Sequence, residues 1–154
     1  MAENQFVLFD GEERSSLLPF TYTRAISDIR IGILKIHEKW DLYFNQNCSI
    51  FSHQNLQLKY PFTAQSNMIF INASVLPETS LIESITKLPL GHSLVSESGK
   101  IIALHPDQHV STLNHLHILS KTSPKVIFNS PYTSITYPWD IFTHNGAQIQ
   151  SDVK

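Results

Sequence analysis

Two short apolar runs, each followed by polar residues and then by a helical pattern, constrain the fold of this chain most. The first run is FVLF at residues 6–9 and the second is MIFI at residues 68–71. Continuous apolar runs of this length are typical of strands that are buried on both faces. Strands that alternate with helices predict an α/β fold with a mainly parallel sheet.

The helix expected after the first run carries a glycine in its middle. Over residues 25–40, apolar side chains recur at spacings of three and four, which predicts one amphipathic helix; they are Ile26, Ile29, Ile33, Ile36 and Trp40. Gly32 lies inside this pattern, and a glycine there costs about 1 kcal/mol relative to alanine. We therefore expect either that the helix breaks at Gly32 or that another backbone packs close to it.

A second helix is expected after the second run. Ser80 and Glu83 are three residues apart and precede an apolar pattern, which predicts a capping box at the helix start. Pro89 is expected to stop this helix, because proline cannot continue the helical hydrogen bonding.

The second half of the chain carries weaker signals. Alternating patterns on both sides of residues 97–100 predict a hairpin. VIFN at residues 126–129 and SITYPW from residue 134 predict later short strands. The segment at residues 105–121 is ambiguous, because its helical spacing is weak.

Length and composition narrow the class of protein. At 154 residues the chain is long enough for one domain with its own core, and two independent domains are not expected. The formal net charge of −2 provides no basic surface for nucleic acid or for an anionic membrane. No apolar run approaches the roughly 18 residues that a membrane-spanning helix needs.

Cysteine usage indicates a reducing, cytoplasmic setting. Cys48 is the single cysteine, so it cannot form an internal disulfide, and the N-terminus does not resemble a secretory signal. No catalytic signature surrounds Cys48, which precedes the apolar Ile50 and Phe51. We interpret it as a small buried hydrophobic residue rather than a nucleophile.

Ligands of parallel α/β sheets bind beyond the carboxyl ends of the strands, which here are residues 10–14 and 72–75. The first segment has one glycine, Gly11, where a phosphate loop needs backbone that approaches an anion closely. Glu12 and Glu13 follow it and would repel a triphosphate unless they turn away or bind a metal. The residues alone leave both a polar turn and a phosphate loop open.

Four histidines form the densest group of potential metal ligands: His105, His109, His115 and His117. A metal site needs three or four ligand atoms that converge on the ion at about 2 Å. His105 and His109 are spaced to share a helix face, but the glutamate of a zinc-protease helix is absent between them. Surface or helix-end histidines are therefore the favoured interpretation, and a metal site is the alternative.

Several long motifs resemble one protein family. LLPFTYTR at residues 17–24, DIRIGILKIHEKW at 28–40, IFINASVLPE at 69–78 and YPWDIF at 137–142 are similar to bacterial, Bacteroidetes-type sugar nucleotidyltransferase-like proteins. These are related to the N-terminal domain of N-acetylglucosamine-1-phosphate uridyltransferase. The resemblance implies a shortened, Rossmann-like nucleotide-diphospho-sugar transferase fold over residues 1–142.

In that family a left-handed β-helix of hexapeptide repeats, which resembles acyltransferases, usually follows this domain. The resemblance therefore implies that the polar residues 143–154 are a linker to a β-helix domain that is absent here. Any oligomer is expected to form through that missing domain.

The resemblance also implies roles for individual residues. Gly11 and Arg14 match the glycine-rich loop and terminal arginine that hold the nucleoside triphosphate, and Asp10 is expected to approach the nucleotide with Gly11. Arg24 falls near the family's proline-lysine pair, so Arg14 and Arg24 are expected to contact phosphates. Asn72 and Ser74 are expected to line the pocket.

The resemblance implies Mg²⁺ as the cofactor, but two of the family's features are missing. The phosphate-contacting lysine is not found, and the metal-binding aspartate would fall at Ala73 or Ser74, where the sequence has no carboxylate. Because Mg²⁺ prefers anionic oxygen ligands, Asp10 or Glu12 is the best remaining candidate to bind it.

Two functions follow from this resemblance. The first is a sugar nucleotidyltransferase that joins a nucleoside triphosphate to a sugar 1-phosphate, with UTP and N-acetylglucosamine-1-phosphate as the expected pair. The alternative is a catalytically degenerate domain that acts as a structural or regulatory partner of the downstream acyltransferase domain.

Overall fold

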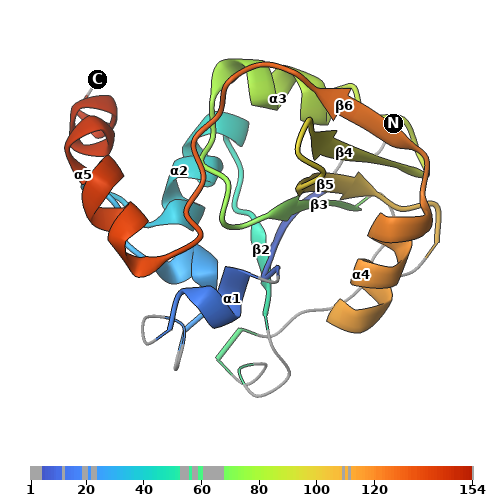
Figure 1. The fold of residues 1–154 in the computed structure, drawn as a ribbon, viewed down its shortest axis with the longest axis horizontal. Helices are drawn as coiled ribbons and strands as arrows, with labels where there is room; N and C mark the ends of the chain where they lie inside the picture. Colours follow the sequence, from blue (N-terminus) through green and yellow to red (C-terminus); the bar gives the residue numbers. More distant parts are fainter. Residues whose placement is uncertain are drawn as a thin grey trace.

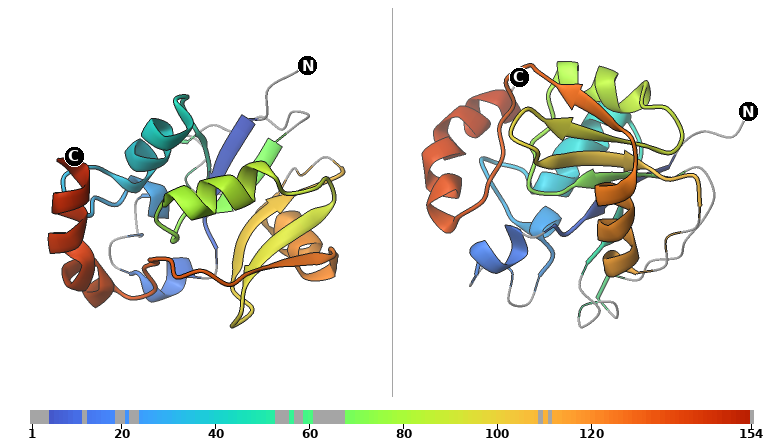
Figure 2. Two further views of the ribbon diagram at one scale, coloured as in Figure 1. Left: turned by 90° about the horizontal axis from the view of Figure 1, so that it is seen from above. Right: turned by 45° about the vertical axis from the view of Figure 1, so that its right-hand side comes forward.

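A central sheet with helices on both faces forms the body of the molecule (Figures 1 and 2). The structure is a computed structural model, which describes the following residues: 5–11, 13–18, 21, 24–52, 56, 59–60, 68–108, 110 and 112–153. The resulting three-layer arrangement confirms the expected Rossmann-like α/β class.

Within the described parts of the chain, the sheet has six strands in the order β2-β1-β3-β5-β4-β6. They are β1 (Gln5–Phe9), β2 (Ser49–Phe51), β3 (Met68–Asn72), β4 (His92–Ser96), β5 (Ile101–His105) and β6 (Lys125–Phe128). Neighbouring strands pair in parallel except at β5, which is antiparallel to both β3 and β4. The mainly parallel sheet, the β4–β5 hairpin and the strand near residue 126 are therefore confirmed.

The two apolar runs of the sequence are central strands that are covered on both faces. In β1, Leu8 packs in one cluster with Trp40 of α2 (Ile36–Phe44) and Leu81 of α3 (Thr79–Thr86). Phe9 packs in a second cluster with Leu116 of α4 (Leu113–Thr122). Because neighbouring side chains face opposite helical layers, an unbroken apolar run suits such a strand better than an alternating one.

The single helix expected over residues 25–40 is wrong. A short 3-10 helix, η1 (Ile26–Asp28), is followed by a bridge between Arg30 and Lys35 and then by α2. Gly32 adopts φ +76°, and a Cβ atom on it would lie 2.8 Å from the backbone carbon of Gln148. Both expectations for Gly32 are thus met, since the helix breaks there and another backbone packs close.

Two further local predictions are corrected. Helix α3 begins at Thr79 with Glu78 as its N-cap and without a side-chain cap hydrogen bond, so the capping box at Ser80 is wrong. The expected strand from residue 134 is only an isolated bridge between Ser134 and Val75. Pro138 starts a helix instead, because its fixed φ suits the first helical turn.

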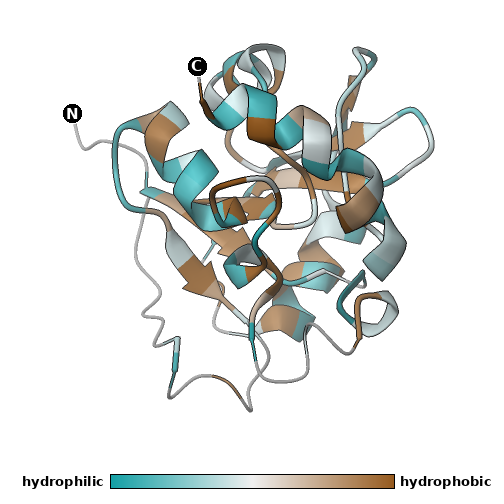
Figure 3. Cartoon of the chain, turned by 90° about the vertical axis from the view of Figure 1, so that its left-hand side faces the viewer, coloured by the Kyte–Doolittle hydropathy of each residue, from teal (hydrophilic) through white to brown (hydrophobic). Residues whose placement is uncertain are grey.

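Helix α5 (Pro138–Asp152) contains most of the residues expected to be a linker. It lies at the margin of the molecule, and hydrophilic and hydrophobic residues alternate along its ribbon (Figure 3). Asn145 Oδ1 accepts a hydrogen bond from the Gly32 N–H at 2.7 Å, and Asp152 Oδ2 accepts from Ile33 and Leu34. Residues 143–152 are therefore a docked helix, while a domain beyond them stays a prediction.

The burial of the single cysteine agrees with its sequence interpretation. Cys48 is partly buried against the core, and burial raises the pKa of its thiol, which agrees with the interpretation as a small hydrophobic residue.

Among the helices that the structure describes, none combines the length and apolar composition needed to cross a membrane.

Candidate functional site

A groove of about 550 Å³ opens at the carboxyl ends of β1 and β3. Its walls come from the loop after β1, the end of β3, the β4–β5 turn and helix α4. Its polar lining includes Gly11, Glu13, Asn72, Lys100, Lys121 and Lys125. The groove lies at the edge of the sheet where a parallel α/β fold binds its ligands.

The lysines make this groove suitable for an anion. Lys100, on the β4–β5 turn, has a side chain that is only 17% exposed, and its Nζ atom lies 3.5 Å from Glu13 Oε2. Burial lowers the pKa of Lys100, although the nearby Glu13 and Asp140 carboxylates oppose this effect. Lys125, at the start of β6, donates from Nζ to the carbonyl of Lys121 at 3.0 Å, which places its amine at the end of α4.

Sequence reasoning did not find Lys100. The residue follows Gly99 in a hairpin turn, where a lysine usually means only an exposed polar loop. Its position in the groove depends on β5 pairing with β3, and no local pattern predicts that pairing. The one available signal was the place of the hairpin directly after the second strand–helix unit.

Asn72, at the end of β3, is held firmly at the floor of the groove. Its Nδ2 donates to the Ile101 carbonyl at 2.9 Å, and its Oδ1 accepts from the backbone N–H and hydroxyl of Ser74. Ser74 is fully buried, and its two hydrogen bonds fix the orientation of the Asn72 side chain. Gly11 lines the groove near Asn72, and a Cβ atom at Gly11 would lie 2.5 Å from Glu13 Oε1.

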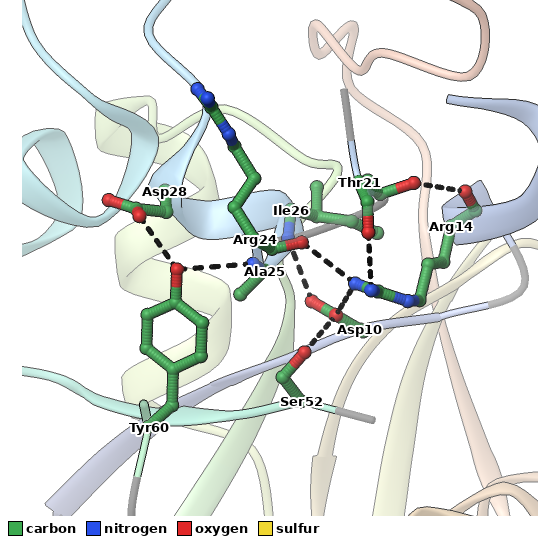
Figure 4. Close-up of polar contacts among 9 residues, drawn as sticks. All are labelled: Asp10, Arg14, Thr21, Arg24, Ala25, Ile26, Asp28, Ser52 and Tyr60. Carbon is green, nitrogen blue, oxygen red and sulfur yellow. Dashed lines mark hydrogen bonds and ion pairs between the residues drawn. The ribbon is translucent and has the colours of Figure 1, made fainter. Parts of the chain in front are cut away.

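Asp10 directly follows β1 and is 2% exposed. Its carboxylate accepts hydrogen bonds from the Ile26 N–H at 3.0 Å, from Arg14 Nη1 at 2.8 Å and from the Ser52 hydroxyl at 2.5 Å (Figure 4). Burial raises the pKa of Asp10 above its ordinary value, and these three donors oppose the shift.

Arg14 completes this network (Figure 4). Its Nη1 also donates to the Arg24 carbonyl at 2.9 Å, its Nη2 donates to the Thr21 carbonyl, and the Thr21 hydroxyl donates to the Arg14 carbonyl at 2.7 Å. The guanidinium therefore ties together the residues between β1 and η1. Arg24 contributes its carbonyl, while its exposed side chain points away from Asp10.

A second network continues from η1. Tyr60 donates its hydroxyl proton to Asp28 at 2.6 Å and accepts from the Ala25 N–H at 3.3 Å (Figure 4). Burial and the hydrogen bond to Asp28 raise the pKa of Tyr60 to about 12. This contact fixes η1 next to the Asp10 network.

The predicted site residues thus fall into two groups. Gly11, Asn72 and Ser74 lie at the groove or directly support it, whereas Asp10 and Arg14 are joined in the loop network. The phosphate contacts predicted for Arg14 and Arg24 stay predictions.

The described residues do not form a metal centre. Across the parts of the chain that the structure describes, no group of three or more histidine, cysteine or acidic side chains could hold an ion. His105 Nδ1 contacts the Leu88 carbonyl at 2.9 Å, and His117 packs edge-on against Phe9. His109 and Glu12 lie outside the described residues. Three donors surround the Asp10 carboxylate, so its surroundings do not fit Mg²⁺.

Comparison with known proteins identifies the family. No curated protein matches the chain. A family model described as sugar nucleotidyl transferase matches residues 6–154, which include in full every helix and five of the six strands that the structure describes. The chain therefore belongs to the sugar nucleotidyl transferase family.

Proposed function

We propose that the groove binds a nucleoside triphosphate and a sugar 1-phosphate and transfers the nucleotidyl group between them. A phosphate oxygen of the sugar phosphate would attack the α-phosphorus, and the bond from that phosphorus to the oxygen bridging the β-phosphorus would break, releasing pyrophosphate. UTP and N-acetylglucosamine-1-phosphate are the expected pair, on the resemblance to N-acetylglucosamine-1-phosphate uridyltransferase.

The observation that carries this proposal is the set of three lysines in the groove of a sugar nucleotidyl transferase family member: Lys100, Lys121 and Lys125. Transfer between phosphates requires positive charge that neutralises the oxygens of the reacting groups and holds them in line. The three lysines provide this positive charge. Gly11, which lines the same groove and has no side chain, lets the backbone come close to a phosphate and hold it in place.

Each predicted site residue has a part in this proposal. The Gly11 backbone and the Asn72 side chain contact the nucleotide, and Ser74 holds Asn72 in place. Asp10 and Arg14 position the loop between them, and a phosphate contact of Arg14 stays a prediction. Arg24 contributes its carbonyl to the same positioning.

Magnesium is expected by resemblance, but the described residues that line the groove offer it few carboxylate ligands. Glu13 is the one carboxylate among the described residues that line the groove, and residues 72–75 have none. Mg²⁺ is commonly held by substrate phosphates together with one or two carboxylates. Any magnesium in this reaction would therefore arrive bound mainly to the triphosphate.

Calorimetric titration tests the proposal. UTP and UDP-N-acetylglucosamine would each be added to the folded chain with and without magnesium, and ATP would serve as the comparison nucleotide. We expect saturable binding of UTP at micromolar to low millimolar concentrations, followed by pyrophosphate release when N-acetylglucosamine-1-phosphate is supplied. A folded sample that binds neither ligand would overturn the proposal.

One observation favours a second candidate. Both terminal nitrogens of Arg14 are bonded inside the loop network, and no carboxylate lies in residues 72–75. A domain that has lost transfer chemistry would serve as a structural or regulatory partner of a hexapeptide-repeat acyltransferase domain. This candidate predicts no pyrophosphate release with any nucleoside triphosphate.

A further inference from the structure

We infer that Lys100 is the cation that contacts the ligand's phosphate, and that the Glu13 carboxylate occupies the phosphate position until the ligand displaces it. This inference rests on the proposed function and assigns its phosphate contact to a residue of the β4–β5 turn. The argument depends on how Lys100 and Glu13 are held.

Lys100 is charged, largely covered and poorly paired. Its side chain is 17% exposed, so it has lost much of its contact with water. Among the described residues it forms an ion pair with Glu13, at 3.5 Å between Nζ and Oε2. Charge-assisted hydrogen bonds between such groups are ordinarily about 2.7–2.9 Å long. A shorter contact with another anion would therefore satisfy Lys100 better than Glu13 does.

Glu13 is also held weakly. Besides the long contact to Lys100, its Oε1 accepts from Asn72 Nδ2 at 3.4 Å, while the same amide group donates to Ile101 at 2.9 Å. The carboxylate can lie over Gly11 only because that residue has no Cβ atom. Leaving this position would thus cost Glu13 two long contacts and free the space above Gly11.

Two other nearby cations, Arg14 and Lys125, donate to partners of their own. Arg14 uses both terminal nitrogens within the loop network. Lys125 donates to the Lys121 carbonyl at the end of α4. Among the groove lysines described, Lys100 is the one with an ion pair to the segment after β1, and its 3.5 Å length leaves room for a shorter contact with an anion.

Displacement of the Glu13 carboxylate by a phosphate predicts opposite effects of the two charges on ligand affinity. A phosphate that reaches Lys100 cannot share the position with Glu13, because two like charges repel at close range. The ligand must therefore displace the carboxylate, and this displacement lowers its affinity. Removing the charge of Glu13 should strengthen phosphate binding, whereas removing the charge of Lys100 should weaken it.

Calorimetry with UTP and with inorganic pyrophosphate, both without magnesium, tests this pair of opposite effects. Lys100→Gln is expected to weaken binding about 10- to 100-fold. Lys100→Arg, which keeps the charge, should retain more binding than Lys100→Gln. Glu13→Gln is expected to tighten binding about tenfold. Lys87→Gln, on an exposed residue outside the groove, is the matched control and should match the unaltered chain, and thermal unfolding checks that each variant is folded.

The outcomes separate this inference from the proposed function. If the unaltered chain binds neither probe without magnesium, the inference is overturned, whereas the proposed function is overturned only if UTP also fails to bind with magnesium. If it binds UTP and Lys100→Gln binds equally well, the inference is overturned and the proposed function stands. If Glu13→Gln weakens binding instead, the displacement is overturned, because Glu13 would then contribute to binding.

A second measurement needs no variant. Limited acetylation of lysines, read by mass spectrometry, would be carried out with and without saturating UTP. Lys100 is expected to be protected by UTP, whereas Lys87 should react equally in both samples. Equal acetylation of Lys100 with and without UTP overturns the contact.

Discussion

Asp10 and Arg14 illustrate how one residue pair can shape a loop that the sequence presents as a possible phosphate site. The buried Asp10 carboxylate is shared by Arg14, Ser52 and the Ile26 N–H. Each of these donors comes from a different segment around the carboxyl end of β1. The pair therefore fixes where the loop begins and where η1 returns.

Asp10→Asn tests this role. The substitution removes the negative charge and one acceptor oxygen, so Arg14 loses its ion pair and at least one neutral donor loses its partner. We expect the free energy of unfolding in urea to fall by about 2 to 4 kcal/mol. Asp107→Asn, on an exposed loop, should change it little. Equal effects of the two substitutions would contradict the role of the network.

Two glycines offer an opposite pair of predictions. At Gly32, alanine would adopt a left-handed φ of +76° and meet the Gln148 backbone at 2.8 Å, so Gly32→Ala should destabilise the protein by more than about 1 kcal/mol. A Cβ atom at Gly146, inside α5, meets nothing within 4 Å. Gly146→Ala should therefore stabilise the protein by up to about 1 kcal/mol. Urea unfolding of both variants measures the two changes in the free energy of unfolding. Changes of the same sign would contradict these predictions.

At the same scale, the sequence predicted some site residues and missed others for physical reasons. Gly11, Asn72 and Ser74 lie at or just after the ends of central strands, so their place at the carboxyl edge was predictable from strand order alone. Lys100 was not, because its position depends on a pairing between β3 and β5. The partners of Arg14 were also hidden, since Thr21 and Arg24 accept through backbone carbonyls that every residue has.

Among the elements, α5 depends most on a few specific contacts. Lys39 and Asp152 form an ion pair at 2.6 Å with side chains only 4% and 6% exposed. Ile141 is the single residue of α5 within the buried core, whereas Trp139 and Phe142 are largely exposed. The polar composition of this segment suggested a linker because its docking contacts are themselves polar.

The Asp152 contact predicts a pH dependence. Burial raises the pKa of Asp152, but Lys39 and the Ile33 and Leu34 N–H groups outweigh burial and hold that pKa below its ordinary value. A lowered pKa in the folded state adds stability above the unfolded pKa, near 4, and this stability is lost as the pH falls through the folded pKa.

Asp152→Asn should therefore cost most at neutral pH. We expect it to lower the free energy of unfolding by about 3 to 5 kcal/mol at pH 7, because Lys39 is left buried without its partner. The cost should shrink below about pH 4, because the unfolded chain then takes up a proton at Asp152 before the folded chain does. Glu83→Gln, on an exposed position of α3, is the control. A cost that is equal at pH 7 and pH 3 would contradict this account.

For the whole molecule, the class of fold was predictable and its details were not. Buried strands and intervening helices give long, consistent apolar patterns, and these predicted the mainly parallel sheet. The break at Gly32 followed from contact with α5, which is more than a hundred residues away in the chain. The strand expected from residue 134 failed because Pro138 and the Asp140 carboxylate, which accepts from the Thr136 and Tyr137 N–H groups, favour a helix start.

The reversed direction of β5 also bears on the order of folding. Leu94 pairs with Ala103 nearby in the chain, whereas Val7 must find Ser49 and Gln5 must find Met68. Hairpins close in about 1 to 10 μs, while parallel pairs wait for long loops to close. Pulse-labelling hydrogen exchange should therefore show protection of β4 and β5 before β1, and the reverse order would contradict this. The turn that carries Lys100 would then be among the first parts of the groove to form, before the loop that it faces.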